Sequence, residues 1–269
     1  MKLFKNALIY DGTGSKAFKG DILVNEDRIV RTADSIPCED AWEVVDLEGL
    51  SVAPGFIDAH SHNDWFAIKN EPRKYFEPFI RQGITSFVTG NCGLSAVGFD
   101  PDSKYIDKVG GGLFSYNGTT GIYPSVSQFF EAIDRNSPCN IAVLAGHCTA
   151  RASVSGYENR ALTEAERTKR LEIMEGALKE GACGLSLGLM YEPGIYAGID
   201  ELKDVARLCE KYDRPMTVHP RACSAVSMTY PLLGRPHLLR ALDELVEIAS
   251  GTKMKLHYSH AIFVGRRSF

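Results

Sequence analysis

Two histidines that lie two residues apart, His60 and His62, are the strongest local signal in the sequence. They follow the run Pro54–Asp58. In an extended strand alternate side chains share a face, so both imidazoles are expected to point the same way as Asp58. Two imidazoles at the end of one strand can both reach a single metal ion. An isolated pair of this kind is as often a surface feature, but the pattern that follows it favours metal ligation.

The elements that would position these histidines follow a repeating pattern. After Pro54-Gly55, short apolar runs alternate with longer amphipathic segments, which is typical of βα units around a parallel sheet. Six runs are interpreted as strands: Val52–His60, Ser86–Asn91, Asn140–Gly146, Cys183–Leu189, Pro215–His219 and Lys255–His260. A closed (β/α)8 barrel needs eight strands and ~250 residues. We therefore expect an α/β fold with an incomplete TIM-type barrel over residues 54–269, as a piece of a longer chain.

Two segments of this barrel are the clearest helices, Glu164–Gly181 and Leu238–Ile248, because their apolar residues recur at helical spacing. Thr163 is the expected N-cap of the first helix, and Glu166 would complete a capping box. The glycine at the end of the same segment is a typical stop signal. These signals predict where the helix begins and ends.

Two regions lie outside this regular pattern. Residues 1–53 read as short strands joined by tight turns, with a hairpin expected at Asn25-Glu26-Asp27, and form a segment separate from the barrel. Residues 100–127 contain Gly110-Gly111-Gly112 and several aromatic residues. They predict a long loop at one mouth of the barrel, where binding residues often lie.

The composition excludes several classes of function. The 269 residues include 30 Lys and Arg against 34 Asp and Glu, so no basic field indicates binding to nucleic acid or to an anionic membrane. The seven cysteines are odd in number and form no CxxC pair, which argues against a secreted disulfide scaffold. Neither a signal peptide nor a bilayer-spanning run is recognisable. We expect a soluble, cytoplasmic protein.

These features resemble the amidohydrolase superfamily of metal-dependent barrel hydrolases, whose members open with an HxH motif on the first strand. More narrowly, the chain is similar to the D-aminoacylase (N-acyl-D-amino-acid deacylase) family over essentially its whole length. Residues 1–53 look like the superfamily's small β-sandwich. The other matching stretches are GITSFVTGNCG (83–93), AGHCTAR (145–151), GLSLGLMYEPG (184–194), VHPR (218–221) and YSH (258–260).

A cysteine takes the place of a familiar metal ligand in this resemblance. Most superfamily members bridge two metals with a carboxylated lysine on the fourth strand, but here that strand, GACGLSLGLMY, contains no lysine. The D-aminoacylase pattern instead supplies a cysteine at the end of the second strand, which corresponds to Cys92. A buried cysteine is often inert. The position of Cys92 after a strand that follows the HxH motif favours a thiolate ligand.

The resemblance also implies His219 and His260 as ligands from the fifth and sixth strands. His257 competes with His260, but residues three apart on a strand face opposite sides, and His260 lies at the carboxyl end where barrel active sites are built. By family likeness, the two later histidines and Cys92 hold a tighter ion, and the first two histidines share Cys92 with a weaker one. The full set suits Zn²⁺, which accepts both nitrogen and sulfur: His60, His62, Cys92, His219 and His260.

The activity implied by the resemblance is hydrolysis of a linear amide by metal-activated water, with N-acyl-D-amino acids as small-molecule substrates. The superfamily's general base is an aspartate at the end of strand eight, which would lie beyond residue 269, so the catalytic residue is unassigned. Asp58 and Asp64 are interpreted as supporting residues. Tyr191 and Arg221 lie where an anionic substrate could be held, although each could equally be structural.

Three observations bear on other functions. A cyclic-amide hydrolase of the dihydroorotase or hydantoinase kind would carry the carboxylated lysine that is absent here. A non-catalytic barrel relative, or an inactive truncated product, fits the missing strands but not the intact ligand set. The letters GLSLG at 184–188 match a serine-hydrolase elbow, but their apolar flanks favour a barrel strand.

Family members often have a lysine where this chain has Ile262, which leaves the preferred side chain of the substrate open.

Overall fold

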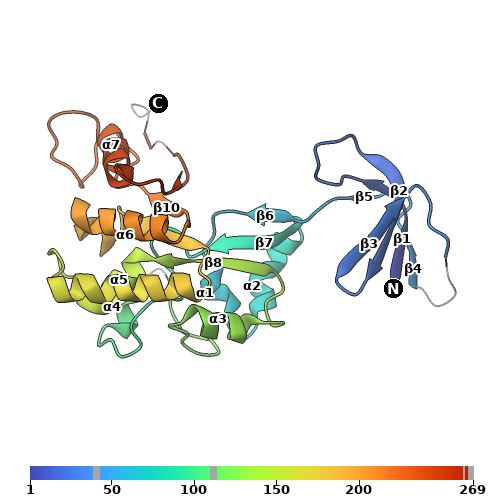
Figure 1. Ribbon diagram of the computed structural model, residues 1–269, viewed down its shortest axis with the longest axis horizontal. Coiled ribbons are helices and arrows are strands. Elements are labelled where there is room, and N and C mark those ends of the chain that lie inside the picture. Colours follow the sequence, from blue (N-terminus) through green and yellow to red (C-terminus); the bar gives the residue numbers. More distant parts are fainter. Residues whose placement is uncertain (39–42, 110–113, 263, 266–269) are drawn as a thin grey trace. The chain divides into compact units, whose positions relative to one another are not determined.

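The computed structural model describes residues 1–38, 43–109, 114–262 and 264–265 (Figure 1). The chain divides into two compact units, Met1–Phe56 and Ile57–Phe269, whereas the sequence places the boundary between residues 53 and 54. The glycines Gly110–Gly112 of the expected loop lie outside the described residues. Within the described ranges, no helix combines the length and the apolar character that crossing a membrane requires.

The first unit is a mixed sheet in the order β3-β2-β1-β4, with β5 paired to β1. Strands β2 and β3 are antiparallel and are joined through Glu26 and Asp27, which confirms the predicted hairpin. Glu26 has the left-handed φ of 52° that such tight turns favour. The described strands form one sheet rather than the two packed sheets of the expected sandwich: β1 (Lys2–Ile9), β2 (Phe18–Asn25), β3 (Arg28–Ala33), β4 (Glu43–Asp46) and β5 (Ser51–Val52).

The second unit is built on a six-stranded sheet whose order, β6-β7-β8-β9-β10-β11, follows the chain. The neighbours from β7 to β11 pair in parallel. Sequential parallel pairing of this kind is the arrangement of a TIM-type barrel, here incomplete, as predicted. The strands are β6 (Phe56–Asp58), β7 (Ile84–Thr89), β8 (Asn140–Gly146), β9 (Gly184–Gly188), β10 (Met216–His219) and β11 (Leu256–Tyr258).

One predicted strand is interrupted. The sequence predicts a continuous strand over Val52–His60, but β5 ends at Val52 and β6 ends at Asp58. Pro54 lies between them and has no N–H to donate to a sheet, which explains the break. The two pieces pair with different partners, β5 with β1 and β6 with β7. His60 therefore follows its strand rather than ending it.

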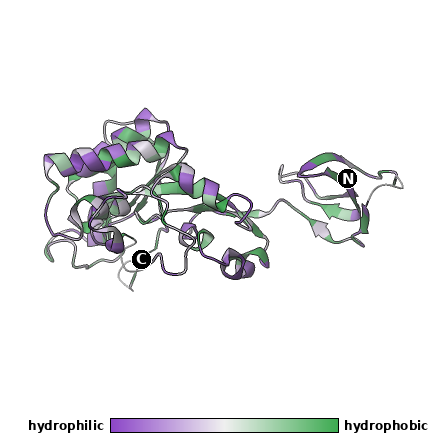
Figure 2. Cartoon of the chain, turned by 90° about the horizontal axis from the view of Figure 1, so that it is seen from below, coloured by the Kyte–Doolittle hydropathy of each residue, from purple (hydrophilic) through white to green (hydrophobic). Residues whose placement is uncertain are grey.

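Seven helices among the described residues pack on this sheet, and their buried residues join those of the strands in one hydrophobic cluster. Phe87 and Val143 from the strands and Phe129, Met174 and Leu202 from the helices are all fully buried in it. Hydrophilic and hydrophobic stretches alternate along these helices (Figure 2). The helices are α1 (Asp64–Ala67), α2 (Pro72–Ile80), α3 (Val126–Ile133), α4 (His147–Ser155), α5 (Glu164–Lys179), α6 (Ile199–Lys211) and α7 (His237–Ala249), with 3-10 turns η1 (Ile106–Lys108) and η2 (Gly194–Tyr196).

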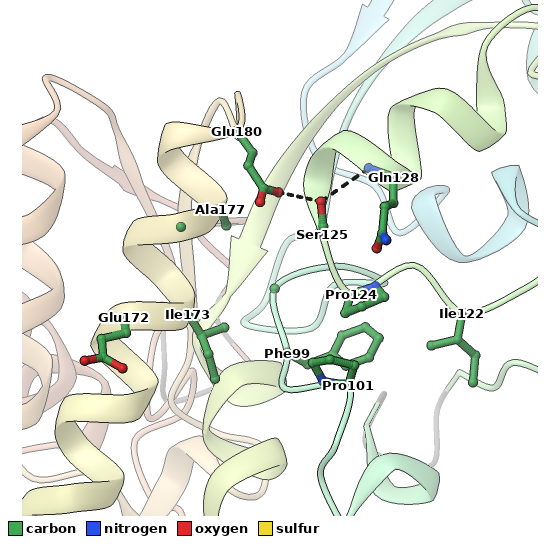
Figure 3. A pocket seen from close by; sticks show the side chains of 12 residues that line it. Phe99, Pro101, Ile122, Pro124, Ser125, Gln128, Glu172, Ile173, Ala177 and Glu180 are labelled. Atoms are coloured by element: carbon green, nitrogen blue, oxygen red, sulfur yellow. Dashed lines mark hydrogen bonds between the residues drawn. The ribbon is translucent and has the colours of Figure 1, made fainter.

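The two ends of α5 show how the local sequence sets its position. At the start, the Thr163 side chain accepts a hydrogen bond from the Glu166 backbone N–H, and the Glu166 side chain accepts one from the Thr163 N–H, which confirms the predicted capping box. At the end, Glu180 accepts a hydrogen bond from the Ser125 hydroxyl at 2.7 Å (Figure 3). It accepts another from the Val126 N–H, also at 2.7 Å. This carboxylate binds the N-terminus of α3 and so fixes α3 against α5. A pocket of about 450 Å³ lies beside this contact.

Candidate metal centre

The strand ends of the second unit bring four of the five predicted ligands together. Cys92 Sγ lies 3.4 Å from His60 Nε2 and 3.5 Å from His260 Nε2. The same sulfur lies 3.6 Å from His219 Nδ1, which is 2.8 Å from His260 Nε2. One sulfur and three imidazole nitrogens from four separate segments therefore converge. We refer to His60, Cys92, His219 and His260 as the ligand cluster.

His62 lies beside the ligand cluster. Its ring centroid is 6.0 Å from that of His60, in an edge-on arrangement. The His62 ring stacks on Phe114 at 5.1 Å, and Phe114 in turn stacks on Trp65 at 5.6 Å. The expected alternation of both histidines along one strand is not present, because β6 ends at Asp58. Phe114 was not predicted from the sequence, where no motif distinguishes it from other loop aromatics.

Tyr191 reaches the ligand cluster. Its hydroxyl lies 3.2 Å from His219 Nδ1, and the two ring centroids are 4.5 Å apart. Burial, together with the nearby Cys92, raises the pKa of Tyr191 to about 12. The phenol is therefore protonated at neutral pH and can donate a hydrogen bond toward the cluster.

Arg221 is occupied by other parts of the protein. Its Nε lies 2.9 to 3.0 Å from both carboxylate oxygens of Glu244 on α7. Its two terminal nitrogens donate to the carbonyls of Ile195 at 2.6 Å and Ala197 at 3.1 Å. These bonds join the segment after β10 to η2 and α7, which is the structural role that the sequence left open for Arg221.

The protonation states in the ligand cluster suit a metal ion. Burial, together with the neighbouring imidazoles, lowers the pKa of His60 to about 4 and that of His219 to about 3. Both rings are therefore neutral at pH 7, which is the form that binds metals. Burial raises the pKa of Cys92 to about 12, and a bound cation would reverse that effect by stabilising the thiolate.

The chemistry of the donor atoms also suits a metal ion. The ring nitrogens that face away from the cluster, His60 Nδ1, His219 Nε2 and His260 Nδ1, are buried and have no hydrogen-bond partner in the described part of the chain. Buried polar atoms are usually satisfied. Neutral imidazoles and a thiol also offer few protons to one another, so their converging atoms are mainly electron-pair donors. Three nitrogens and one sulfur form a donor set that fits Zn²⁺.

The turn that carries Cys92 has an unusual backbone. Cys92 adopts a left-handed φ of 55°, which is uncommon outside glycine, between Gly90 at 75° and Gly93 at 74°. A Cβ added at Gly90 would lie 2.1 Å from the Leu144 carbonyl oxygen, so only glycine fits there. The strand predicted to continue to Asn91 ends at Thr89, because this turn begins at Gly90.

Asp64 connects this turn to the histidine-bearing segment. The carboxylate is fully buried and accepts hydrogen bonds from the backbone N–H of Ala96 at 2.7 Å and of Gly90 at 3.3 Å. It also accepts a hydrogen bond from the Thr89 hydroxyl. Burial outweighs these bonds and raises the pKa of Asp64 to about 6. Asp64 lies two residues after His62 and so joins the segments of two predicted ligands.

His147 and His257 lie outside the ligand cluster. His257 is exposed on β11. His147 is fully buried at the start of α4, with its Nε2 2.8 Å from Glu201 Oε1. Arg151 Nε donates to the same carboxylate oxygen at 3.1 Å. This buried ionic group was not predicted from the sequence: His147 and Arg151 share one turn of α4, but their partner Glu201 lies on α6, fifty residues further along the chain.

Comparisons with known sequences identify relatives of the whole chain. The model of the amidohydrolase family matches residues 43–264. The N-acyl-D-aspartate deacylase of Alcaligenes xylosoxydans xylosoxydans is 30% identical over 99% of this chain and 50% of its own length. The D-aminoacylase of the same organism is 29% identical over 99% of this chain and 51% of its own length.

Solved structures give a similar result. A D-aminoacylase studied for the role of its binuclear metal centre has a TM-score of 0.82 at 27% identity, covering all of this chain and 53% of its own. The N-acyl-D-glutamate deacylase of Bordetella bronchiseptica, solved with zinc and a phosphonate inhibitor, has a TM-score of 0.74 at 29% identity, covering 95% of this chain and 50% of its own. The chain spans about half the length of the curated relatives it matches. It belongs to the amidohydrolase family.

Proposed function

We propose that this protein is a metal-dependent hydrolase of linear amides and that N-acyl-D-amino acids are its substrates. The observation that supports this most directly is the convergence of Cys92 Sγ with three imidazole nitrogens at 3.4 to 3.6 Å. The relatives that cover the whole chain are named as deacylases of N-acyl-D-amino acids. The donor set and the relatives therefore favour the same class of reaction.

The proposed cofactor is zinc, with one ion bound tightly and a second bound more weakly. Cys92, His219 and His260 are the proposed ligands of the tighter ion, and His60 and His62 would share Cys92 for the weaker one. When bound, zinc lowers the pKa of a water molecule and polarises the amide carbonyl. The neutral state of His60 and His219 supports this assignment. The position of His62 outside the cluster is consistent with weaker binding at the second position.

Tyr191 is the proposed substrate-binding residue of this part of the chain. Its protonated hydroxyl lies at the edge of the ligand cluster, 3.2 Å from His219 Nδ1. From there it can donate a hydrogen bond to the oxygen of a substrate bound at the cluster. We do not propose Arg221 as a substrate contact, because its guanidinium already binds Glu244 and two backbone carbonyls. We assign no general base among the residues of this chain; by the family resemblance it would be an aspartate of strand eight.

The absence of a lysine from β9 favours linear over cyclic amides. A cyclic-amide hydrolase of this superfamily would carry a carboxylated lysine on the fourth strand. Strand β9, the fourth strand here, has the sequence Gly-Leu-Ser-Leu-Gly and contains no lysine. A D-hydantoinase that aligns at 14% identity with a TM-score of 0.56 shares the fold alone. Neither observation favours ring opening.

The test is hydrolysis by the complete gene product after loading with zinc. Matched N-acetyl-D- and N-acetyl-L-amino acids, a hydantoin and dihydroorotate serve as substrates, and release of free amine or ring opening is measured. We expect release from D-substrates that stops after removal of metal by a chelator and returns when zinc is added. Ring opening without hydrolysis of any N-acyl-D-amino acid would contradict the proposal.

A further inference from the structure

Strand β9 packs directly against the turn that carries Cys92. All five residues of Gly184–Gly188 are buried. A Cβ added at Gly188 would lie 1.9 Å from the Cys92 carbonyl oxygen, so the two backbones are in contact. Because side chains alternate along a strand, Ser186 shares a face with Gly184 and Gly188, which lie two residues before and after it. The Gly-Leu-Ser-Leu-Gly sequence therefore places one small polar side chain where β9 meets the turn.

The Ser186 hydroxyl spans the turn from one side to the other. Its Oγ accepts a hydrogen bond from the Gly93 N–H at 3.0 Å and donates one to the Gly90 carbonyl oxygen. Those two residues flank Asn91-Cys92, and a serine hydroxyl has the one donor and the free acceptor positions that this needs. Ser186 is fully buried and bonded in both directions, which is unlike an exposed serine nucleophile.

Three residues of this turn have a left-handed φ, namely Gly90, Cys92 and Gly93. Such a backbone persists only where the surroundings hold it. The Cys92 side chain leaves the turn at its centre and meets the imidazoles of His60, His219 and His260. The direction of the thiol thus depends on the backbone that Ser186 holds at both ends.

We propose that Ser186 is a positioning residue for metal binding, whose hydroxyl fixes the Cys92 turn so that the thiolate is presented to the ligand cluster before metal arrives. This inference rests on the proposed function, because it concerns the metal centre proposed above. Strand β9 would thus support the metal centre through Ser186 without supplying a ligand to the metal. A purely structural role would instead lower the stability of the fold and leave sulfur coordination unchanged.

The experiment compares Ser186→Ala and Ser186→Thr with the unsubstituted complete gene product, each loaded with Co²⁺ and, separately, titrated with Zn²⁺. The thiolate-to-cobalt charge-transfer band reports sulfur coordination, and the titration gives the zinc affinity. Ser153→Ala is the matched control. Ser153 Oγ is a buried hydroxyl that likewise donates to a carbonyl, of Ala150 at 2.8 Å, and accepts from a backbone N–H, of Asp100 at 3.3 Å.

We expect Ser186→Ala to lose most of the charge-transfer band and to bind zinc roughly tenfold more weakly, as is typical when a group that orients a ligand is removed. Ser186→Thr and Ser153→Ala should keep both properties. An unchanged band and affinity in folded Ser186→Ala would overturn the inference about Ser186 alone. A gene product without any such band would overturn the proposed metal centre as well.

A second comparison applies if Ser186→Ala does not fold. Ser186→Thr keeps the hydroxyl, so it is expected to fold and to show the charge-transfer band at full strength. A folded Ser186→Thr protein without the band would overturn the proposal, because the hydroxyl would then be present without positioning the thiolate.

Discussion

The thiol of Cys92 lies within 3.4 to 3.6 Å of three imidazole nitrogens. A cation bound between these atoms would offset the free-energy cost of bringing their electron pairs so close together. Burial and, after it, the neighbouring rings lower the pKa of His60 and of His219, which leaves electron pairs facing a common point. Burial keeps the Cys92 thiol protonated unless a positive charge is nearby. At the scale of single residues, the site is thus built to gain from a divalent ion and to release a proton when it binds.

Replacement of Cys92 tests this directly. We expect the unsubstituted gene product to retain about one to two zinc ions per chain after dialysis, and Cys92→Ala to retain roughly half of that or less, because the shared sulfur ligand is lost. Metal analysis of the purified proteins measures this. Cys139→Ala is the control, since Cys139 is also buried but lies before β8 and outside the ligand cluster. Equal zinc content in all three proteins would refute the role of Cys92.

Tyr191→Phe separates substrate binding from metal binding. The ring can keep its packing on His219 while the hydroxyl is removed. We expect kcat/KM for an N-acyl-D-amino acid to fall about 100-fold, in the range measured when one hydrogen-bond donor to a reacting oxygen is lost, with unchanged zinc content.

The control for this change is Tyr196→Phe. The Tyr196 hydroxyl donates to Glu192 on the same segment and makes no contact with the ligand cluster among the described residues. Its loss should leave kcat/KM within about twofold, as for a surface group away from the chemistry. A similar fall in both variants would show that the segment as a whole, and not the Tyr191 hydroxyl, matters.

The sequence predicted part of this residue-level detail. The HxH motif identified His60, and the strand-end positions with the family resemblance led to Cys92, His219 and His260, which the structure brings together. Side-chain alternation also predicted that His62 shares a strand face with His60, but the strand ends at Asp58, and the His62 ring lies beside the cluster with its centroid 6.0 Å from that of His60. The stacking of Phe114 on His62 depends on how a long loop folds back, which no local pattern in the sequence encodes.

Helices and strands were more predictable than the contacts between them. The helix predicted over Glu164–Gly181 is present as Glu164–Lys179, because capping and periodicity are local properties. The strand prediction for Asn140–Gly146 agrees with β8. Errors occur where the backbone leaves the regular pattern: at Pro54, at the left-handed turn that starts at Gly90, and at His260, which has a φ of 32° and follows β11 instead of ending the strand predicted over Lys255–His260.

The capping box of α5 gives a prediction at this scale. Thr163→Ala removes the acceptor for the Glu166 N–H and should lower the free energy of unfolding by about 1 kcal/mol. Urea denaturation followed by circular dichroism measures it. Thr168→Ala, at an exposed position within the same helix, should change stability by less than about 0.5 kcal/mol. A cost at Thr168 as large as that at Thr163 would argue against the cap.

The ionic group around Glu201 acts on the whole second unit, because it joins α4, α5 and α6. Glu201 Oε1 lies 2.8 Å from His147 Nε2, 3.1 Å from Arg151 Nε and 3.9 Å from Arg170 Nε. Burial alone would raise the pKa of Glu201, but the hydrogen bond to His147 and the charges of the two arginines outweigh burial and lower the pKa to about 2. The folded protein therefore favours the ionised carboxylate.

The sign of this shift predicts a pH dependence. Since the pKa is lower in the folded state than its ordinary value of 4.5, the stabilisation is complete above pH 4.5 and is lost as the pH falls toward 2. Glu201→Gln should destabilise the fold by about 3 kcal/mol at pH 7, because the buried Arg151 loses its counter-charge and the buried Arg170 is left with Asp204 at 3.8 Å, and by less at pH 3.

Urea unfolding at both pH values measures the effect of Glu201→Gln. The control is Glu247→Gln, whose partner Lys203 lies 3.2 Å away in an exposed pair and whose loss should cost less than about 1 kcal/mol. If Glu201→Gln destabilised the protein equally at pH 7 and pH 3, the ionised carboxylate would not be the source of the stabilisation.

The most direct test of the whole account is X-ray absorption at the zinc edge of the complete gene product. We predict a sulfur neighbour at about 2.3 Å together with imidazole nitrogens at about 2.0 to 2.1 Å, and the loss of the sulfur signal in Cys92→Ala. A bound zinc ion surrounded only by nitrogen and oxygen in the unsubstituted protein would contradict it.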